Sequence, residues 1–394
     1  MKPRVLVLTA GYGEGHNAAA RALTAAFDDA HGAGTALMVD VFDVVAPRLG
    51  RISRQAYIEM INSLPRAWSL VYAWADRSWL LPRFFALLLR ERRAIERLIE
   101  QERPTAICCT YPVYAFLLER IKRTRGLAVP YFNIVTDSIS INSLWWRAPC
   151  ASWFVPNEDS AEAMRRGGVA SDRVEVCGFP VARYFSEHTG EIQPPDLAAG
   201  AAPRVLYMIN SGTRDAAEIA RRLLSEQDWE VTCAVGRDAE LRRQLTSYAA
   251  GRARPAEILG WTDQIPRLLM SHHVLVSKAG GATVQEAIAA RCPMIVNQIV
   301  PGQEEGNYEL LRRHGAGALA ETPDTVLEEL KRAFADGGRG WRAWRDALAS
   351  LTRPDAARDI AARVVALSRP TNEPVPVPLR AAADDHEVIE RATA

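Results

Sequence analysis

The sequence predicts an α/β protein built from two doubly wound, Rossmann-like domains that face each other across a cleft. The first observation is a repeated alternation of short apolar segments with segments of helical period, which is typical of parallel sheets covered by helices. The second is that this alternation stops in a proline- and alanine-rich stretch and then restarts. The third is length, because 394 residues exceed the usual size of one domain.

These observations divide the chain into five parts. We predict a first domain over residues 1–185, a linker over 186–203 and a second domain over 204–350. Residues 351–368 are predicted to form a helix that packs back on the first domain. Residues 369–394 are rich in proline and then in charge, so we predict that they are disordered.

Composition narrows the class of protein. The chain is 48% hydrophobic and 24% charged with a net charge of +1, which suits a soluble globular protein and does not indicate a nucleic-acid partner. Its six cysteines show no CxxC spacing and are predicted to be reduced, buried thiols. No signal peptide is recognisable, and the apolar stretch 79–89 is too short to span a bilayer. We therefore expect a cytoplasmic protein that is able to touch a membrane surface.

The first half opens with a strand over Arg4–Leu8, a glycine-rich turn over Thr9–His16 and a helix over Asn17–Phe27. Further strands are predicted at 36–41, 105–109, 131–135, 152–155 and 173–177. His16 falls near the start of the helix, where it either faces the crevice above the sheet or merely caps the helix. Asp137 follows the strand 131–135, at the sheet edge where open α/β sheets bind ligands, although a turn cap is an alternative.

Residues 48–97 differ in character from the rest of this half. They contain ten arginines and four acidic residues, interleaved with aromatic side chains and interrupted by Pro65 and Pro82. Such helices suit a membrane interface, with aromatic rings at the headgroups and arginine toward anionic lipid. A helical insertion with its aromatic side chains in the core is the alternative. The candidate membrane contacts are Trp68, Trp74, Trp79 and Arg83.

The second half repeats the alternation, with strands predicted at 204–208, 231–235, 256–259 and 274–277 and later helices from Thr322, Gly340 and Pro354. Its most informative stretch is Val276–Asn307. A strand, the pair Gly280-Gly281 and a helix form a place where backbone N–H groups and a helix N-terminus can bind phosphate. Glu286 stands one turn into that helix, where it can accept hydrogen bonds from ribose hydroxyls. A second apolar run leads into a polar loop over 301–307, so the stretch indicates a nucleotide-sugar site.

Four loops in this order resemble one family. They are T-A-x-Y-G-x-G-H at 9–16, V-T-D at 135–137, S-K-x-G-G-x-T at 277–283 and P-G-Q-E-E-G-N at 301–307. They are similar to the monogalactosyldiacylglycerol synthases and processive diacylglycerol glucosyltransferases, a glycosyltransferase family 28-like group related to the peptidoglycan lipid-II synthase. The resemblance covers roughly residues 5–367 and implies a GT-B fold. It also implies an inverting transfer of glucose or galactose from a UDP-sugar to diacylglycerol, in glycolipid synthesis at the cytoplasmic face of the membrane.

The resemblance also implies roles for individual residues. On the donor side it implies contacts with the diphosphate, ribose, uracil and sugar from Ser211, Gly212, Gly260, Trp261, Lys278, Gly280, Gly281, Thr283, Glu286, Gly302, Gln303, Glu304 and Asn307. On the acceptor side it implies Tyr12, Gly15, His16, Asp137, Asn142 and Trp145. His16 is preferred to Asp137 as the general base, because an imidazole matches the working pH more easily. Asn142 and Ala151 stand where the family usually carries His and Asp, so the acceptor side is altered.

Several functional expectations remain open. No DxD-like pair follows a strand, and helix N-termini can stabilise the leaving diphosphate, so neither an obligatory metal nor another cofactor is expected. The expected partners are a UDP-sugar, diacylglycerol or a related lipid, and an anionic membrane surface. One alternative is transfer to a polyprenyl or non-lipid acceptor, which the changes at Asn142 and Ala151 motivate. The other is a non-catalytic regulator that binds a nucleotide sugar.

Overall fold

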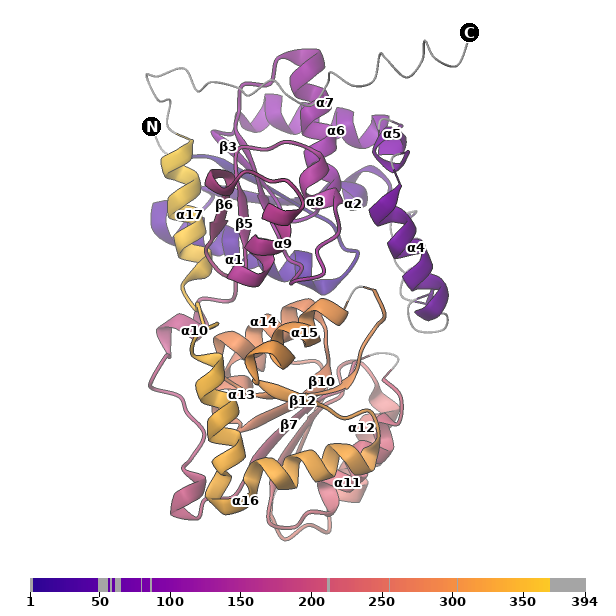
Figure 1. Cartoon of the computed structure of the whole chain (residues 1–394), viewed down its shortest axis with the longest axis vertical. Coiled ribbons are helices and arrows are strands. Elements are labelled where there is room, and N and C mark those ends of the chain that lie inside the picture. The colour runs from indigo at the N-terminus through magenta and orange to yellow at the C-terminus, as the bar shows by residue number, and fades with distance from the viewer. Residues whose placement is uncertain are drawn as a thin grey trace.

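The computed structural model describes residues 3–48, 56, 59–60, 65–78, 80–85, 87–210, 213–254, 256–302 and 304–368. They form two α/β domains, each built around a six-stranded parallel sheet, which lie end to end along the long axis of the molecule (Figure 1). The two α/β domains expected from the alternation are therefore present. The expected disorder of residues 369–394 concerns residues outside the described part of the chain.

The first sheet contains strands β1 (Val5–Thr9), β2 (Ala36–Asp40), β3 (Ala106–Cys109), β4 (Tyr131–Ile134), β5 (Trp153–Val155) and β6 (Val174–Val176). Their order is β2-β1-β3-β4-β5-β6, and Val5 of β1 lies opposite Ala36 on one side and Ala106 on the other. Its helices are α1 (Glu14–His31), α2 (Val41–Val45), α4 (Pro65–Arg77), α5 (Leu81–Phe85), α6 (Leu89–Glu102), α7 (Val113–Arg125), α8 (Leu144–Arg147) and α9 (Glu158–Arg166).

The second sheet contains strands β7 (Arg204–Met208), β8 (Glu230–Ala234), β9 (Ala256–Leu259), β10 (Val274–Lys278), β11 (Met294–Gln298) and β12 (Gly317–Leu319). Their order is β12-β11-β10-β7-β8-β9. Its helices are α11 (Ala216–Ser225), α12 (Ala239–Ala249), α13 (Ile265–Ser271), α14 (Gly281–Ala289), α15 (Glu305–His314) and α16 (Pro323–Leu348). Helix α16 bends sharply at Asp336–Gly338, where three consecutive residues have positive φ, so the helices expected from Thr322 and Gly340 meet at a kink.

Continuous apolar runs form the central strands because both faces of a parallel sheet are covered. All five residues of β1 are buried, and Ala20, Leu23 and Phe27 of α1 pack on one face of the first sheet. The last helix, α17 (Ala356–Leu367), lies beside α1 and adds Ile360 to the same core (Figure 1). The chain thus crosses back from the second domain to the first after α16.

The connection between the two sheets contains α10 (Tyr184–Glu187) and a short 3-10 turn at Leu197–Ala199. Another 3-10 turn, Ser171–Arg173, lies within the first domain and precedes β6. Across it, Ala19 of α1 shares an apolar cluster with Val284 of α14 and Phe179, so the carboxyl edges of the two sheets meet. No helix among the described residues is both long enough and apolar enough to cross a bilayer.

Two boundaries differ from expectation. Helix α1 begins at Glu14 rather than at Asn17, because Gly13, with φ of 123°, forms the turn and leaves His16 inside the first helical turn. The prediction of a loop over 301–307 is wrong for residues 305–307. Helix α15 begins at Glu305, so Asn307 belongs to a helix and its side chain is buried.

Candidate active site

Each sheet has one point where the strand order reverses, and this is where open α/β sheets bind ligands. In the first sheet the reversal lies between β1 and β3, and in the second between β7 and β10. The segments that leave these strands approach one another: an added Cβ on Gly15 would lie 3.7 Å from the Ala282 amide nitrogen, and one on Gly281 would lie 3.7 Å from the Thr136 carbonyl oxygen. The two reversal points therefore face each other across the domain interface.

His16 is fixed at the first reversal point by the ends of two strands. Its Nδ1 is hydrogen-bonded to Thr136 Oγ1 at 2.9 Å, and its ring meets the ring of Tyr111 edge to face at 5.1 Å. Burial lowers the pKa of His16 to about 4, opposed by a backbone hydrogen bond to Thr110. The imidazole is consequently neutral at physiological pH.

Asp137 follows β4, as the sequence predicts. The Trp145 indole Nε1–H donates to Asp137 Oδ2 at 2.8 Å. Burial raises the pKa of Asp137 to about 6, and the Trp145 hydrogen bond opposes the rise. A carboxylate with this pKa is ionised at neutral pH but is a stronger base than an ordinary aspartate, which is the property that a general base needs.

One cavity of about 240 Å³ brings these groups together. Of the residues proposed for the acceptor side, it is lined by Tyr12, His16, Asp137, Asn142 and Trp145. Gly15 lies beside it, facing the second domain. Further walls, which the sequence did not assign to the acceptor side, come from the insertion helices, from the segment after β3 including the start of α7, and from α8. They are Val71, Tyr72, Ala75, Leu81 and Phe85, then Tyr111, Pro112 and Val113, and finally Leu144. Tyr111 was detectable, since it follows a strand end as Asp137 does; the residues of α4 and α5 were not.

The insertion is attached to the loop that follows β4. The amide of Ser143 donates to Asp76 Oδ1 and its hydroxyl to the Asp76 carbonyl, both at 2.6 Å. Arg147 donates to the carbonyl oxygen of Ser78 at 2.6 Å. These bonds fix the end of α4 over the cavity, so its wall is a defined part of the first domain.

At the second reversal point, β10 leads through Gly280 into α14. Gly280 has ordinary extended backbone angles, so its conformation does not require glycine. A Cβ there would instead project between Thr283 Oγ1 at 3.7 Å and Glu304 Oε1 at 3.9 Å. These are ordinary van der Waals distances, so the protein itself does not require glycine at this position, which directly precedes the N-terminus of α14.

The loop after β11 is held by internal polar contacts. Lys278 Nζ donates to Glu304 Oε1 at 3.0 Å, and the Val300 amide donates to Glu304 Oε2 at 3.0 Å. Asn307 Nδ2 donates to the Ala279 carbonyl oxygen at 3.0 Å, which joins α15 to the glycine turn. Glu304 and Asn307 are therefore engaged with the protein as well as being near the proposed donor position.

Glu286 is half-buried on the side of α14 that faces α1. Burial raises the pKa of Glu286 to about 7; Arg21 opposes the rise and Glu14 adds to it.

The other residues predicted for the donor side are spread over more distant loops. Gly260 and exposed Trp261 follow β9, the edge strand, and Gly302 lies in the loop after β11. Ser211, Gly212, Gln303 and Trp79 lie outside the described residues, as does the side chain of Trp68.

Metal-binding side chains do not gather here: the described residues contain no group of three or more His, Cys, Asp or Glu arranged to hold a metal ion. The Lys278 ammonium group, paired with Glu304, contributes positive charge at the second reversal point, and the partial positive charge of the α14 N-terminus adds to it.

Comparison with known proteins supports the predicted resemblance. The family described as Monogalactosyldiacylglycerol (MGDG) synthase matches residues 16–181. A processive diacylglycerol beta-glucosyltransferase from Bacillus cytotoxicus is 23% identical over 364 residues, which cover 91% of this chain and 92% of that protein. The predicted resemblance to these glycolipid synthases is thus confirmed.

Solved structures agree with the predicted fold class. The calicheamicin glycosyltransferase CalG4 superimposes with a TM-score of 0.58 at 14% identity, covering 94% of this chain and 100% of that chain. UDP-GlcNAc 2-epimerase from Neisseria meningitidis, bound to UDP-GlcNAc, gives 0.58 at 12% identity, covering 92% and 100%. These likenesses and the two parallel sheets confirm the GT-B fold.

Proposed function

We propose that this chain is an inverting hexosyltransferase that moves glucose or galactose from a UDP-sugar to diacylglycerol at a membrane surface. Its similarity to processive diacylglycerol glucosyltransferases over nearly the whole chain supports this reaction. The observation that carries the proposal is the cavity that holds Asp137 and His16 opposite the N-terminus of α14. A basic group on one side of the cleft and an anion-binding site on the other match a transfer with a diphosphate leaving group.

Within this proposal, Asp137 is the general base. A base must remove the proton from the acceptor hydroxyl as its oxygen attacks C1 of the sugar. The pKa of Asp137, raised to about 6, matches this task better than the pKa of His16, lowered to about 4. His16 Nδ1 is also already bonded to Thr136. His16 then orients the acceptor, which reverses the preference that residue type alone suggested.

The donor half of the proposal rests on α14 and the loops beside it. The first amides of α14 bind the diphosphate, Glu286 accepts from the ribose hydroxyls, and Lys278 and the helix N-terminus stabilise the charge that develops on UDP. The reaction on this proposal needs no obligatory metal ion. On this proposal Gly302 and Glu304 contact the sugar, and Trp261 contacts the uracil.

The acceptor half rests on the walls of the cavity. Apolar and aromatic side chains from α4 and α5 face Asp137 across a volume of about 240 Å³. This is below the roughly 300–1,000 Å³ of drug-sized pockets, so the cavity accepts the glycerol head and leaves the acyl chains outside. If the acyl chains remain in the bilayer, the mouth of the cavity must lie at the membrane surface.

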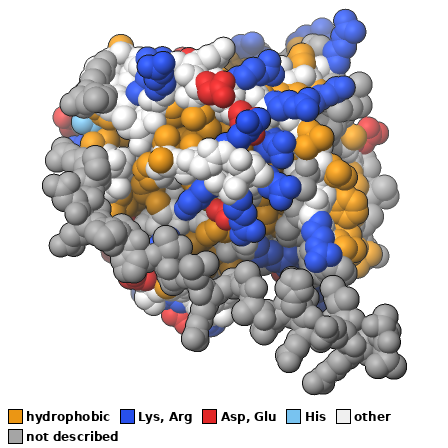
Figure 2. All heavy atoms as spheres, turned by 90° about the horizontal axis from the view of Figure 1, so that it is seen from above, with side chains coloured by type: hydrophobic (Ala, Val, Ile, Leu, Met, Phe, Trp, Pro, Cys, Tyr) orange, Lys and Arg blue, Asp and Glu red, His pale blue; other side chains and the backbone are white. Residues whose placement is uncertain are grey.

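The exposed face of the first domain supports that location. Figure 2 shows Lys and Arg side chains gathered on this face with hydrophobic side chains among and beside them. The exposed apolar side chains of the insertion are Leu70, Val71, Trp74, Leu80, Phe84, Leu87 and Leu89. Exposed basic residues accompany them at Arg77, Arg83, Arg90, Arg93 and Arg97. We name these twelve residues the membrane face; it suits an anionic surface of the cytoplasmic leaflet.

The test is a transfer assay on vesicles. The full chain is incubated with diacylglycerol in anionic vesicles and either UDP-glucose or UDP-galactose, and UDP release and lipid mass are followed. We expect UDP release that depends on diacylglycerol, a product heavier by one or more hexoses, and no loss of rate in a chelator. Release of UDP at the same rate without diacylglycerol, with no hexosylated lipid, would refute lipid transfer.

A further inference from the structure

The turn after Asp137 lies directly between the two domains. Its residues are Ser138, Ile139 and Ser140, and we name it the interdomain turn. The Ser140 amide donates to the Ser138 carbonyl oxygen at 2.6 Å, and Ile139 has a φ of 54°. A β-branched residue adopts positive φ only where its surroundings impose it, since this conformation costs free energy. The contacts that impose it here come from both domains.

The second domain contacts this turn in two places. Gln285 of α14 donates through Nε2 to Ser138 Oγ at 2.9 Å, and both side chains are buried. Gly306, in the first turn of α15, packs against the turn so closely that a Cβ would lie 2.0 Å from the Ser138 carbonyl oxygen and 2.7 Å from the Ser140 amide nitrogen. Glycine at 306 is therefore required by the approach of another segment and not by its own backbone angles.

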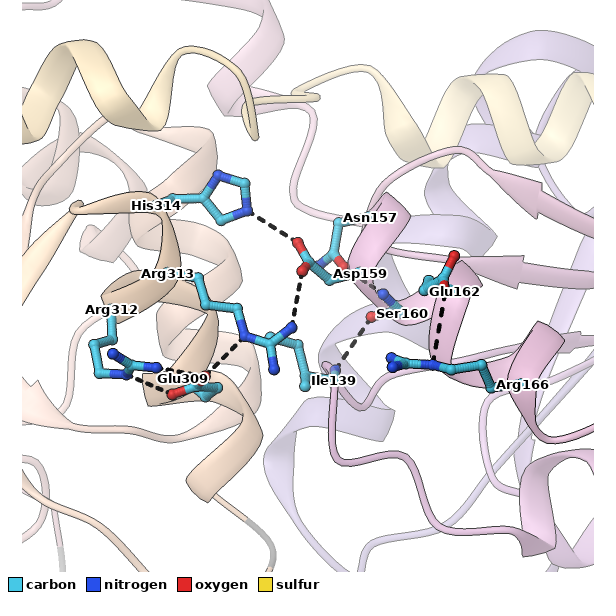
Figure 3. Close-up of polar contacts among 10 residues, drawn as sticks. All are labelled: Ile139, Asn157, Asp159, Ser160, Glu162, Arg166, Glu309, Arg312, Arg313 and His314. Carbon is cyan, nitrogen blue, oxygen red and sulfur yellow. Dashed lines mark hydrogen bonds and ion pairs between the residues drawn. The ribbon is translucent and has the colours of Figure 1, made fainter.

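The first domain supports the turn from the other side. The Ile139 amide donates to Ser160 Oγ at 3.4 Å, and Asn157 caps α9 by accepting from the Ser160 amide at 2.9 Å. Figure 3 shows Ile139, Ser160 and Asn157 grouped on the α9 side of the interface. The turn is thus enclosed by α9 of its own domain and by α14 and α15 of the other.

The far end of α15 is joined to the first domain as well. Arg313 forms an ion pair with Asp159 of α9 at 3.2 Å, and His314 Nε2 lies 2.9 Å from the other Asp159 oxygen (Figure 3). Glu309 orients Arg313 from within α15 at 2.8 Å. Helix α15, which continues directly from the proposed sugar-binding loop, therefore docks on the first domain at its start and at its end.

We propose that Gln285 and Gly306 position Asp137 through the interdomain turn, so that donor binding and placement of the general base are coupled. This inference rests on the proposed function, because it assigns Asp137 the role of base. A UDP-sugar that orders the start of α14 and the loop before α15 also orders the two contacts on Ser138. Ser138 adjoins Asp137 in the chain, so the carboxylate is fixed in place when the donor is present.

Three variants test the coupling through its two contacts. Ser138→Ala and Gln285→Leu each remove the hydrogen bond, and Gly306→Ala inserts a methyl group against the turn. We expect each to lower kcat about tenfold while the Kd for UDP stays within about twofold, because a lost buried hydrogen bond has an effect of this order. The double variant of Ser138 and Gln285 is expected to be no worse than either single variant.

Matched controls separate coupling from general damage. Gly251→Ala adds a methyl group in open space in the second domain, and Gln244→Leu changes an exposed glutamine of α12; both are expected to leave kcat unchanged. If Gly306→Ala fails to fold, Ser138→Ala and Gln285→Leu still test the proposal. Unchanged kcat in both of them, or a loss of UDP affinity equal to the loss in kcat, would overturn the proposal.

A second readout does not depend on catalysis. Hydrogen exchange of a peptide spanning the interdomain turn is measured with and without UDP. We expect UDP to slow exchange in the unmodified protein and to do so much less in Gln285→Leu. Equal slowing in both proteins would contradict the coupling. If the unmodified protein transfers no sugar to diacylglycerol, the proposed function fails, while the exchange measurement still tests the coupling on its own.

Discussion

The two strand-reversal points share an architecture but differ in how their sites are built. The donor side comes mainly from one continuous stretch, from β10 to the start of α15, and uses backbone amides, two glycines and one Lys–Glu pair. The acceptor side comes from segments spread between Tyr12 and Trp145 and uses aromatic walls around two buried ionisable groups. A site for a diphosphate can thus be short and local, whereas a site that must hold a hydroxyl of a lipid beside a base is assembled from distant segments.

The largest expected effect separates the two ionisable groups of the acceptor side. Asp137→Asn keeps the shape of the side chain and removes its basicity, so kcat should fall about a thousandfold. In the unmodified protein kcat should rise with pH through about 6 and then level off, because the pKa of Asp137 is raised to about 6 by burial and the ionised form is active. The residual activity of the variant should not show this rise of kcat near pH 6. Steady-state rates from pH 3 to 8.5, a range that covers the pKa values of both groups, provide the measurement.

The control for this experiment is Asp172→Asn, an exposed aspartate of the first domain, which should leave the profile unchanged. If kcat instead rises near pH 4, and this rise disappears in His16→Ala, the general base is His16. That result would restore the preference drawn from residue type.

An intermediate effect is expected on the donor side. At pH 8.5, where Glu286 is ionised because its pKa is about 7, Glu286→Gln removes the charge that is proposed to accept from the ribose hydroxyls. The Kd for UDP should then rise about tenfold, as expected for a hydrogen bond to a charged group. The effect on kcat at saturating donor should be small. Isothermal titration with UDP measures it, and Glu257→Gln, on the exposed side of β9, is the matched control. A Kd equal to that of the control would place the ribose elsewhere.

The smallest expected effect concerns the membrane face of the first domain. Trp74→Ala with Phe84→Ala removes two rings that are 55% and 54% exposed, so binding to anionic vesicles should weaken by about fivefold to tenfold. UDP binding should not change. Flotation with vesicles at low and high salt measures this, and Tyr248→Ala, 47% exposed in the second domain, is the control. Equal flotation of all three proteins would argue against this face as the contact.

Much of the fold and of the donor side was predictable because the signals are local. Apolar runs separated by glycine turns and amphipathic segments indicate buried parallel strands and their helices, and this pattern identified the two α/β domains. The turn at Gly280 and the helix after it were likewise recognisable, since a strand, a glycine turn and a helix are consecutive in the chain. The start of α15 was missed because Pro301 and Gly302 suggest a loop that continues further than it does.

The acceptor side was only partly predictable for a physical reason. His16 and Asp137 stand at strand ends, which a topology argument locates, and the cavity does contain both. Their pKa values depend on burial, which no local pattern encodes. Tyr111 packs against His16, and Trp145 is hydrogen-bonded to Asp137. The need for glycine at position 306 was not predicted, because it arises from a contact with Ser138, 168 residues earlier in the chain.

The sequence by itself determined the two sheets, the strand ends at which ligands meet and the short glycine turn that suits a phosphate. These follow from hydrophobic period and backbone geometry within a few residues. Only the tertiary structure decided which walls surround Asp137, which of the two candidate bases has the better-matched pKa, and that the donor domain touches the turn beside it. Burial and close packing between distant segments set those properties, because desolvation and steric contact depend on what lies nearby in space rather than in the chain.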